Sequence, residues 1–380
     1  MELKRRKVGN VRAKRTGFTL VELLVVITII GILVALIAVA GAGALKTARQ
    51  AEIKTELDQL SMAFEHYSAS SYPPNCQTDD QLENAPPEPA ATPLSEVQVL
   101  TDLKRHMKQA FPRHRESESL LRILVGLSVS DTTNFPRVLA GGMTAGEAIV
   151  FWLGGFSADP RYPISGEGGP SYDVIGVTTG ERRERDTLQR SWVMPLELAR
   201  LAPRAEDGYF NEGDGRFIEY TVTVNGVVQT RRINFWQYVP KKSTQPYLYF
   251  DVSRHPAAVN TGGTITAPFD PPAATELTGL GADGMGLHVH AVKTINQSAA
   301  ANEPPIVFAN PDKFQIIHCG IDDEWGVEAF ERMSAHGVLE VFGRNDKAED
   351  YLPFPTGPFT GDVADTIVNF SSSSLEKSQP

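Results

Sequence analysis

The feature that most constrains this chain is an apolar stretch from Phe18 to Leu45 whose only charged residue is Glu22. A stretch of this length can span a bilayer as a helix, since about 20 apolar residues suffice. A carboxylate inside such a span costs roughly 2.5–3.5 kcal/mol on insertion scales, so Glu22 requires a functional reason. A secretory signal has an apolar stretch of only about 7–15 residues, and a plain signal anchor leaves Glu22 unexplained.

The distribution of charge predicts the topology. Residues 1–17 contain seven basic residues and one acid, a balance of 7 − 1 = +6. The positive-inside rule keeps this segment cytoplasmic, so the chain after residue 45 lies outside the inner membrane. The whole chain carries −10, and residues 18–380 therefore carry −10 − 6 = −16. This balance argues against nucleic acid as a partner, because phosphate binding needs basic clusters, and it is compatible with divalent cations.

Helical periodicity continues beyond the apolar stretch. No proline occurs between Phe18 and Tyr72, so we expect one long helix over 18–72, membrane-spanning first and amphipathic afterwards. Residues 73–93 contain six prolines and predict an extended linker. The amphipathic part carries one apolar stripe at spacings of three, four and seven, formed by Ala48, Ile53, Leu57, Leu60, Ala63, Phe64 and Tyr67.

The rest of the chain divides into three parts. Residues 94–210 predict a helical and loop elaboration, with helices within 94–130 and at 145–153 and loop over 157–190. Residues 211–370 predict antiparallel strands, because Asn225-Gly226 between two β-rich runs is a strong hairpin signal. Further strands are expected at 246–252, 314–318 and 337–342, and residues 371–380 are expected to form a flexible tail. This order of elements predicts an α+β fold.

Two cysteines, Cys76 and Cys319, face an oxidising compartment in this topology. They could pair and tie the end of the long helix to the C-terminal region, or they could remain two free buried thiols. The sequence does not set their separation, so both alternatives stay open.

The segment Gly17-Phe18-Thr19-Leu20-Val21-Glu22, behind its basic leader, resembles the type III signal of type IV pilins and of type II secretion pseudopilins. The resemblance implies that a prepilin peptidase cuts after Gly17 and methylates the new N-terminus at Phe18. Glycine suits such a cut, because any side chain would obstruct close approach to the backbone. It also implies a long helix packed against an antiparallel sheet.

Glu22 is then expected to act in assembly. Cleavage creates a cationic amine on Phe18, and in a bundle of apolar helices neither this amine nor the Glu22 carboxylate can be left unpaired. Pairing Glu22 with the Phe18 amine of a neighbouring subunit satisfies both charges and fixes the axial step between subunits. The competing interpretation is a contact within one helix, where the two groups lie about one turn apart.

The C-terminal region resembles the pseudopilins a second time. The segment from Asn310 to Gly326 is similar to their strand followed by a glycine- and aspartate-containing loop, and the segment from Gly361 to Phe370 to their closing acidic loop and last strand. In those relatives the loop holds Ca²⁺, which takes six to eight oxygen ligands. The alternative is a set of solvated turn acids. The resemblance gives as candidate ligands Asp322, Asp323, Glu324, Asp362 and Asp365.

The functional expectation is a pilin-like structural subunit of a type II secretion pseudopilus. The alternatives are a minor or tip subunit of a type IV pilus, or a membrane-anchored binding or enzymatic domain behind a borrowed pilin leader. No HExxH, nucleophile-elbow or Walker sequence occurs, so we expect no enzymatic activity. The resemblance implies as partners prepilin peptidase, other pilin-like subunits, an inner-membrane assembly platform and a cytoplasmic ATPase. It implies a single-pass inner-membrane protein with a periplasmic C-terminal domain that assembles into a filament.

Overall fold

The computed structural model describes most of the chain in two compact units, Met1–Arg49 and Gln50–Pro380. Helix α1 (Leu20–Tyr67) contributes residues to both units. Gly17 and Phe18 lie outside the described residues. The structure describes residues 19–67, 72–74, 76, 96–135, 139, 142–170, 172–174, 190–191, 193–203, 216–224, 227–253, 259–261, 264–266, 274–277, 287–289, 291–295, 306–310, 313–325, 339–341, 354–359 and 361–380.

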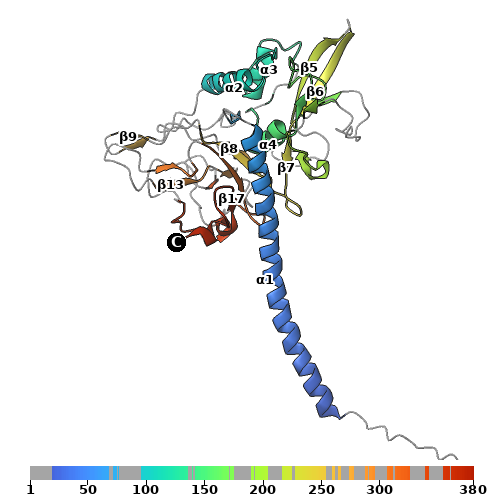
Figure 1. The fold of residues 1–380 in the computed structure, drawn as a ribbon, viewed down its shortest axis with the longest axis vertical. Coiled ribbons are helices and arrows are strands. Elements are labelled where there is room, and N and C mark those ends of the chain that lie inside the picture. Colours follow the sequence, from blue (N-terminus) through green and yellow to red (C-terminus); the bar gives the residue numbers. More distant parts are fainter. Residues whose placement is uncertain are drawn as a thin grey trace, which may run out of the picture. The chain divides into compact units, whose positions relative to one another are not determined.

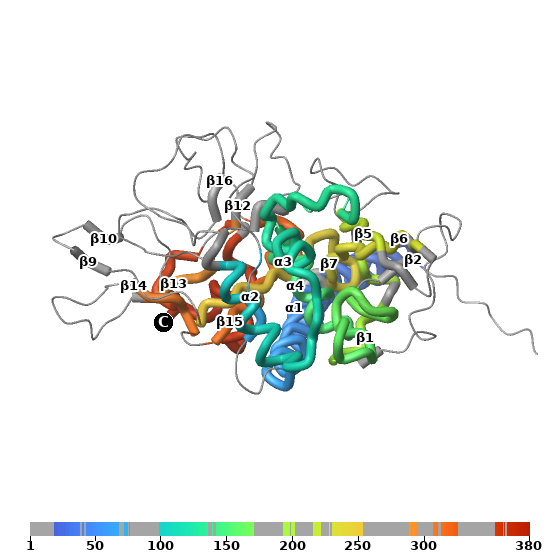
Figure 2. The backbone as a smooth tube through the Cα atoms, turned by 90° about the horizontal axis from the view of Figure 1, so that it is seen from above, coloured from blue at the N-terminus to red at the C-terminus, as the bar shows by residue number. Residues whose placement is uncertain are grey.

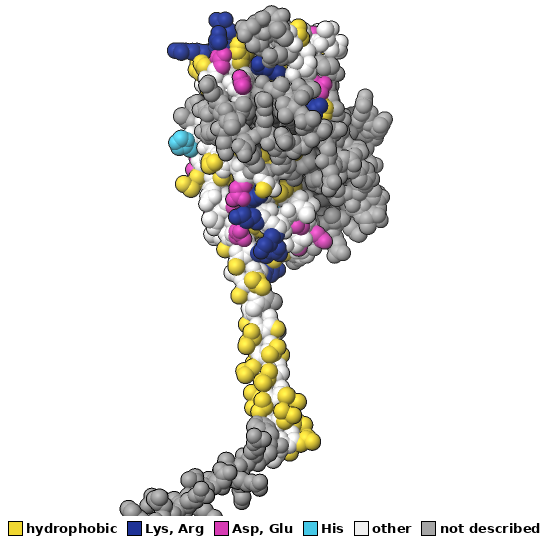
Figure 3. All heavy atoms as spheres, turned by 90° about the vertical axis from the view of Figure 1, so that its right-hand side faces the viewer, with side chains coloured by type: hydrophobic (Ala, Val, Ile, Leu, Met, Phe, Trp, Pro, Cys, Tyr) yellow, Lys and Arg dark blue, Asp and Glu magenta, His cyan; other side chains and the backbone are white. Residues whose placement is uncertain are grey.

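The part of α1 that belongs to the first unit carries its apolar side chains exposed. Leu20 is 80% and Ile37 68% exposed, and a Cβ placed on Gly31 would touch nothing within 4 Å. Hydrophobic side chains lie all along this stretch in Figure 3. Within the described part of the chain, α1 is the one helix long and apolar enough to cross a membrane. An apolar surface of this extent needs a lipid or protein environment.

The part of α1 in the second unit packs as an amphipathic helix. Its stripe residues Leu57, Leu60 and Phe64 are completely buried. They lie in one core with residues of a three-stranded antiparallel sheet in the order β17-β15-β8, formed by Ile367–Val368, Phe314–His318 and Leu248–Asp251. The Phe64 ring stacks on Tyr249 with centroids 4.3 Å apart. The predicted α+β architecture, a long helix packed on antiparallel strands, is confirmed (Figure 1).

Three further helices surround this core. They are α2 (Glu96–Ala110), α3 (Glu118–Leu124) and α4 (Ala145–Leu153), as the sequence predicts for 94–130 and 145–153. Helix α4 is buried along its whole length, and a reciprocal capping box between Thr144 and Glu147 satisfies its N-terminal donors. Seen from above in Figure 2, α4 lies among α1, α3 and the strand β7 (Trp236–Tyr238), at the centre of the second unit.

A second group of strands follows α4. The hairpin of β5 (Phe217–Val224) and β6 (Val227–Asn234) pairs in full register, from Phe217 opposite Asn234 to Val224 opposite Val227. The hairpin is therefore confirmed, although Asn225-Gly226 lies outside the described residues. Strand β2 (Tyr172–Val174) extends this sheet to the order β2-β6-β5. Two short antiparallel pairs accompany it, β1 (Phe156–Ser157) with β3 (Arg190–Ser191) and β4 (Leu201–Pro203) with β7 (Trp236–Tyr238).

The remaining strands are three or four residues long. Most pair antiparallel, and β12 with β16 is a parallel pair. The strand expected at 337–342 is present as β16, and the short helices η3 (Leu198–Arg200), η5 (Gly361–Asp365) and η6 (Glu376–Ser378) complete the described elements. The short strands of this group are β9 (Val259–Thr261), β10 (Thr264–Thr266), β11 (Ala274–Leu277), β12 (Leu287–Val289), β13 (Lys293–Ile295), β14 (Ile306–Phe308) and β16 (Leu339–Val341).

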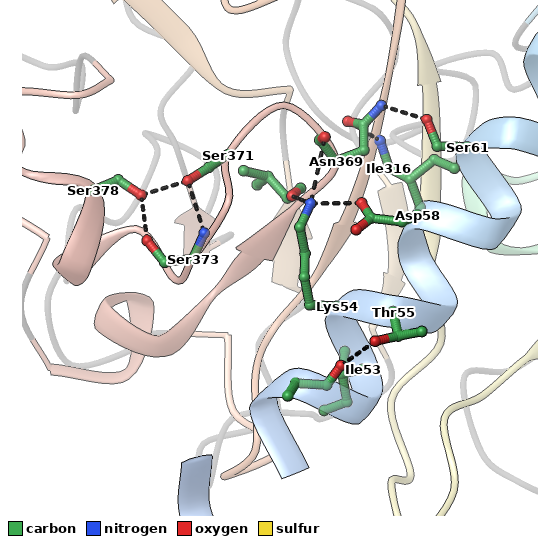
Figure 4. A network of polar contacts seen from close by, with 12 residues as sticks. Ile53, Lys54, Thr55, Asp58, Ser61, Ile316, Asn369, Ser371, Ser373 and Ser378 are labelled. Carbon is green, nitrogen blue, oxygen red and sulfur yellow. Dashed lines mark hydrogen bonds and ion pairs between the residues drawn. The ribbon is translucent and has the colours of Figure 1, made fainter. Parts of the chain in front are cut away.

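Residues 371–380 are folded rather than a flexible tail. Leu375 is completely buried, and its N–H donates to the Thr366 carbonyl at 2.9 Å. The Lys54 ammonium of α1 donates to the Val368 carbonyl at 3.0 Å and pairs with Asp58 at 2.7 Å (Figure 4). Leu375 and the bonded hydroxyls of Ser371, Ser373 and Ser378 hold this polar segment in place, and Lys54 fixes the strand just before it. Composition alone does not reveal such contacts.

Both cysteines are free and buried, which decides between the two alternatives left by the sequence. Cys76 lies in the core around α1, α2 and α4, whereas Cys319 lies in a second core with Leu248, Phe250 and Trp325. The two thiols therefore belong to different hydrophobic clusters and act as small apolar side chains.

Candidate assembly site and acidic loop

The first turn of α1 is closed by a capping box. The Glu22 carboxylate accepts hydrogen bonds from both the backbone N–H and the hydroxyl of Thr19, each at 2.8 Å. In return, the Glu22 N–H donates to the Thr19 hydroxyl at 3.2 Å. These bonds satisfy donors that the start of a helix leaves without intrahelical partners. The Thr-x-x-Glu spacing is the sequence signal of this motif, and the sequence analysis did not use it.

The capping box fixes the position of the Glu22 carboxylate and so limits the groups it can bind. It holds the carboxylate beside the N-terminal turn, where the helix dipole also favours a negative charge. An ammonium group brought to this turn would meet an oriented acceptor. The expected partner, the amine of Phe18, lies outside the described residues, so the pairing of Glu22 stays a prediction.

A buried ionic cluster holds the second part of α1 to the globular unit. The Arg200 guanidinium forms a bidentate ion pair with the Glu56 carboxylate, and their side chains are 10% and 16% exposed. Glu56 also accepts hydrogen bonds from the hydroxyls of Tyr238 at 3.1 Å and Tyr247 at 2.7 Å. The guanidinium lies 4.4 Å from the centre of the Tyr238 ring, and its Nε donates to the Val239 carbonyl at 2.8 Å.

The two tyrosine hydroxyls of this cluster stay protonated. Burial raises the pKa of Tyr247 and of Tyr238, and the negative charge of Glu56 raises both further. Both phenols therefore remain donors across the physiological range. A carboxylate with four charged or phenolic donors in a partly buried site is a strong and specific attachment point.

One part of this cluster has a signal in the sequence. Glu56 lies between Ile53 and Leu57, at the edge of the apolar stripe that predicts the buried face of the helix. A carboxylate at such a position needs a partner, because unpaired charges are rarely buried. The partner, Arg200, lies 144 residues further along the chain, and no sequence pattern identifies it.

The structure places four of the five predicted calcium ligands in or beside one loop. Asp323 accepts from the Ser243 hydroxyl at 2.5 Å and from the Thr244 N–H at 2.9 Å. Asp365, 5% exposed, accepts from the Ile321 N–H at 2.8 Å. Asp322 accepts from the Glu324 N–H at 3.1 Å, and the side chains of Asp322 and Glu324 are exposed. The side chain of the fifth residue, Asp362, lies outside the described residues.

Gly320 makes this arrangement possible. Its φ is +121°, and a Cβ on it would lie 2.2 Å from an Asp365 carboxylate oxygen. Only glycine combines this backbone conformation with so close a carboxylate. The loop after β15 is therefore shaped to receive Asp365 from η5, which brings two acidic segments together as the sequence resemblance implies.

Beside these acids, His318, Cys319 and Asp323 place potential ligand atoms within 4.8 Å of one another. The imidazole is already engaged, because its Nδ1 accepts from the Gly320 N–H at 3.0 Å and its Nε2 lies 3.2 Å from the Gln245 carbonyl. Burial lowers the pKa of His318 to about 4. Burial raises the pKa of the Cys319 thiol, and the charges of Asp323, Asp322 and Asp365 raise it further. Both groups are therefore neutral, as core residues are.

Comparison with known proteins identifies the N-terminal segment. A family model described as the prokaryotic N-terminal methylation motif matches residues 12–38. The matched residues include Gly17, Phe18 and Glu22 and the start of α1. The chain thus carries the prepilin signal of type IV pilins and pseudopilins, which marks it as a pilin-like substrate of prepilin peptidase. No curated protein and no solved structure matches the chain.

Proposed function

We propose that this chain is a structural subunit of a type II secretion pseudopilus, assembled through α1 after removal of the leader. The observation that carries the proposal is the prepilin signal running directly into a long helix, whose first part is exposed and apolar and whose second part packs on an antiparallel sheet. An exposed apolar helix suits a subunit that leaves the membrane and buries the same surface among neighbouring helices.

The arrangement of the C-terminal region supports a pseudopilus over a type IV pilus. Strand β15, the acidic loop at 319–325, η5 and the last strand β17 follow one another in the order that resembles major pseudopilins. Cys319 and Cys76 are free, so they do not form a terminal disulfide loop. The length of 380 residues and the helical elaboration around α2, α3 and α4 suit either a minor or tip subunit or an elaborated subunit that repeats along the filament.

The proposal includes topology and partners. The seven basic residues of 1–17 keep the leader in the cytoplasm, and the second unit lies in the periplasm. An inner-membrane platform and a cytoplasmic ATPase would drive assembly, since no nucleotide-binding sequence occurs in this chain. We propose a structural rather than an enzymatic role, because no catalytic motif is present in the sequence.

Maturation should depend on Gly17. Replacing Gly17 by Phe should leave the leader of 17 residues attached, because a bulky side chain blocks close approach of the peptidase to the backbone. The mass of the protein purified from a strain with prepilin peptidase measures this. Replacing Gly9, in the same leader but away from the junction, is the control and should leave cleavage intact. Efficient cleavage of the Gly17→Phe variant would contradict the proposed processing.

We further propose that the acidic loop holds Ca²⁺. The donor chemistry fits, since Asp322, Asp323 and Asp365 are hard oxygen ligands placed around the same loop. Asp362 would come from η5, beside Asp365. One bound calcium ion carries two positive charges against the five acidic side chains of the two segments, so it would offset part of their negative charge and leave the loop acidic.

Calcium should therefore raise the melting temperature of the mature chain in detergent. A ligand at a hundredfold excess over its Kd stabilises the folded state by about 2.7 kcal/mol. Replacing Asp362 and Asp365 together by asparagine should abolish this shift, whereas Asp159→Asn, on an exposed turn elsewhere, should retain it. A melting temperature that is the same with and without millimolar calcium would favour solvated turn acids.

A further inference from the structure

The segment from α2 to α3 forms a basic surface on an acidic protein. Residues 104–122 contain six basic and two acidic residues, 6 − 2 = +4, whereas residues 18–380 as a whole carry −16. Lys104 pairs with Glu118 at 2.8 Å, and Arg105 pairs with Asp102 at 3.1 Å. Glu116 points inward and is 9% exposed.

Three of the four remaining cations of this segment face solvent, and the fourth, Arg122, is half-buried, with its Nε donating to the Ser128 carbonyl at 3.1 Å. Lys108, Arg113 and Arg115 are exposed and form no ion pair with any described residue. Arg161 adjoins them, because the Arg115 N–H donates to its carbonyl at 2.6 Å, but its guanidinium is paired with Asp159 at 2.9 Å. We therefore define Lys108, Arg113 and Arg115 as the basic surface. Its concentration of uncompensated positive charge, on a chain that is otherwise strongly negative, calls for an acidic partner.

The acidic loop offers a complementary surface on the same chain. The carboxylates of Asp322 and Glu324 are exposed there. The adjoining turn carries Lys241 and Lys242, of which Lys241 pairs with Glu197 at 3.8 Å. With three acidic residues at 322–324 beside two lysines, the loop and its adjoining turn contain more acidic than basic side chains.

The two surfaces lie at different ends of the second unit. Helices α2 and α3 lie at one end and β17 lies toward the other (Figure 1). The acidic loop belongs with β17, since the Ile321 N–H donates to Asp365 of η5, two residues before β17. One copy therefore cannot close this contact on itself, and the same contact repeated between copies is head-to-tail.

We propose that the basic surface of one subunit contacts the acidic loop of a second copy of this chain. The inference rests on the proposed function as a filament subunit and adds a contact between globular units to the contacts of α1. A heterologous contact of this kind leaves one unused surface at each end, so it continues into an open filament whenever the rotation between copies does not close a ring. Screening limits it to short range, because exposed charges interact over about 8 Å at physiological salt.

Charge reversal tests the contact with the full mature chain in detergent, at low ionic strength and with a chelator present. The basic-reversed variant is R113E with R115E, and the acid-reversed variant is D322K with E324K. Like charges facing each other oppose docking, so each variant alone should lose oligomers. Its association constant should fall by about tenfold or more. Sedimentation velocity measures the size distribution.

Mixtures give the decisive result. The basic-reversed variant keeps its acidic loop and the acid-reversed variant keeps its basic surface, so an equal mixture should form dimers and nothing larger. A chain that carries all four reversals should regain oligomers. Lys313→Glu, exposed but outside both surfaces, should leave the wild-type distribution unchanged.

Three outcomes would overturn the contact. They are oligomers that survive either reversal, a mixture that stays monomeric, and a basic-reversed variant that keeps oligomers but loses binding to heparin, which would assign the surface to an anionic polymer. Failure of the proposed function is distinguishable from these results, because it would show as uncleaved leader or absence from the secretion filament while the purified chain still forms charge-dependent oligomers.

Discussion

Replacing Glu56 by alanine should destabilise the second unit by about 3–5 kcal/mol, the cost of leaving a buried partner charge without its counterion. Arg200 is 10% exposed and would retain its charge, while Tyr238 and Tyr247 would each lose an acceptor. A loss of this size is a large fraction of the 5–15 kcal/mol that stabilises a typical domain. We expect α1 to detach from the sheet before the rest of the unit unfolds.

Urea denaturation of the mature chain in detergent, followed by tryptophan fluorescence, measures this loss. Glu52→Ala is the matched control, since Glu52 lies one turn earlier on the same helix and is exposed. Tyr247→Phe removes one hydrogen bond and should cost about 1 kcal/mol. Equal stability of Glu56→Ala and Glu52→Ala would show that the ionic cluster contributes nothing to attachment.

The contrast between Glu56 and its neighbours shows how far the sequence can predict this fold. The stripe of Leu57, Leu60 and Phe64 repeats at helical spacing, so periodicity alone identifies the buried face. The charged partner of Glu56 cannot be predicted in this way, because Arg200 lies in η3, far along the chain. Local patterns report which face is buried and carry no information on which distant side chain meets it.

The strands show the same limit. The β5–β6 hairpin is predictable because two alternating runs flank a turn dipeptide. Strands of three residues, such as β9, β13 and β16, are too short to establish a period of two, and they exist through their partners. The sheet order β17-β15-β8 likewise depends on tertiary packing, because each pair joins segments separated by long stretches of chain.

The sites divide in a similar way. The motif around Gly17 is contiguous and chemically specific, and the family match at 12–38 agrees with it. The acidic loop requires the Asp365 carboxylate to lie against Gly320. This contact depends on the positive φ of Gly320 and on its lack of a side chain, and the sequence shows only that a glycine is present there. The residues of the basic surface lie on the helical elaboration and form no contiguous motif, so the sequence does not mark them as a site.

Replacing Glu22 by glutamine should permit membrane insertion and leader cleavage but reduce assembly at least about tenfold, the effect of losing some 1.4 kcal/mol per contact. The physical reason is the charge, since an amine and a carboxylate in an apolar bundle each need the other. Glutamine also serves at this position of a capping box, so the variant keeps the bonds to Thr19 and removes only the charge.

Thr19→Ala provides the opposite control. It removes the cap and keeps the Glu22 charge, at a cost to the helix of about 0.5–2 kcal/mol. If Glu22 acts between subunits through its charge, the Thr19→Ala chain should still assemble, whereas the Glu22→Gln chain should accumulate in the membrane in mature form. Quantifying mature protein in sheared filament and membrane fractions separates the two. Full assembly of Glu22→Gln together with failure of Thr19→Ala would show that Glu22 serves only to start its own helix, and the charge pair between subunits would then be wrong.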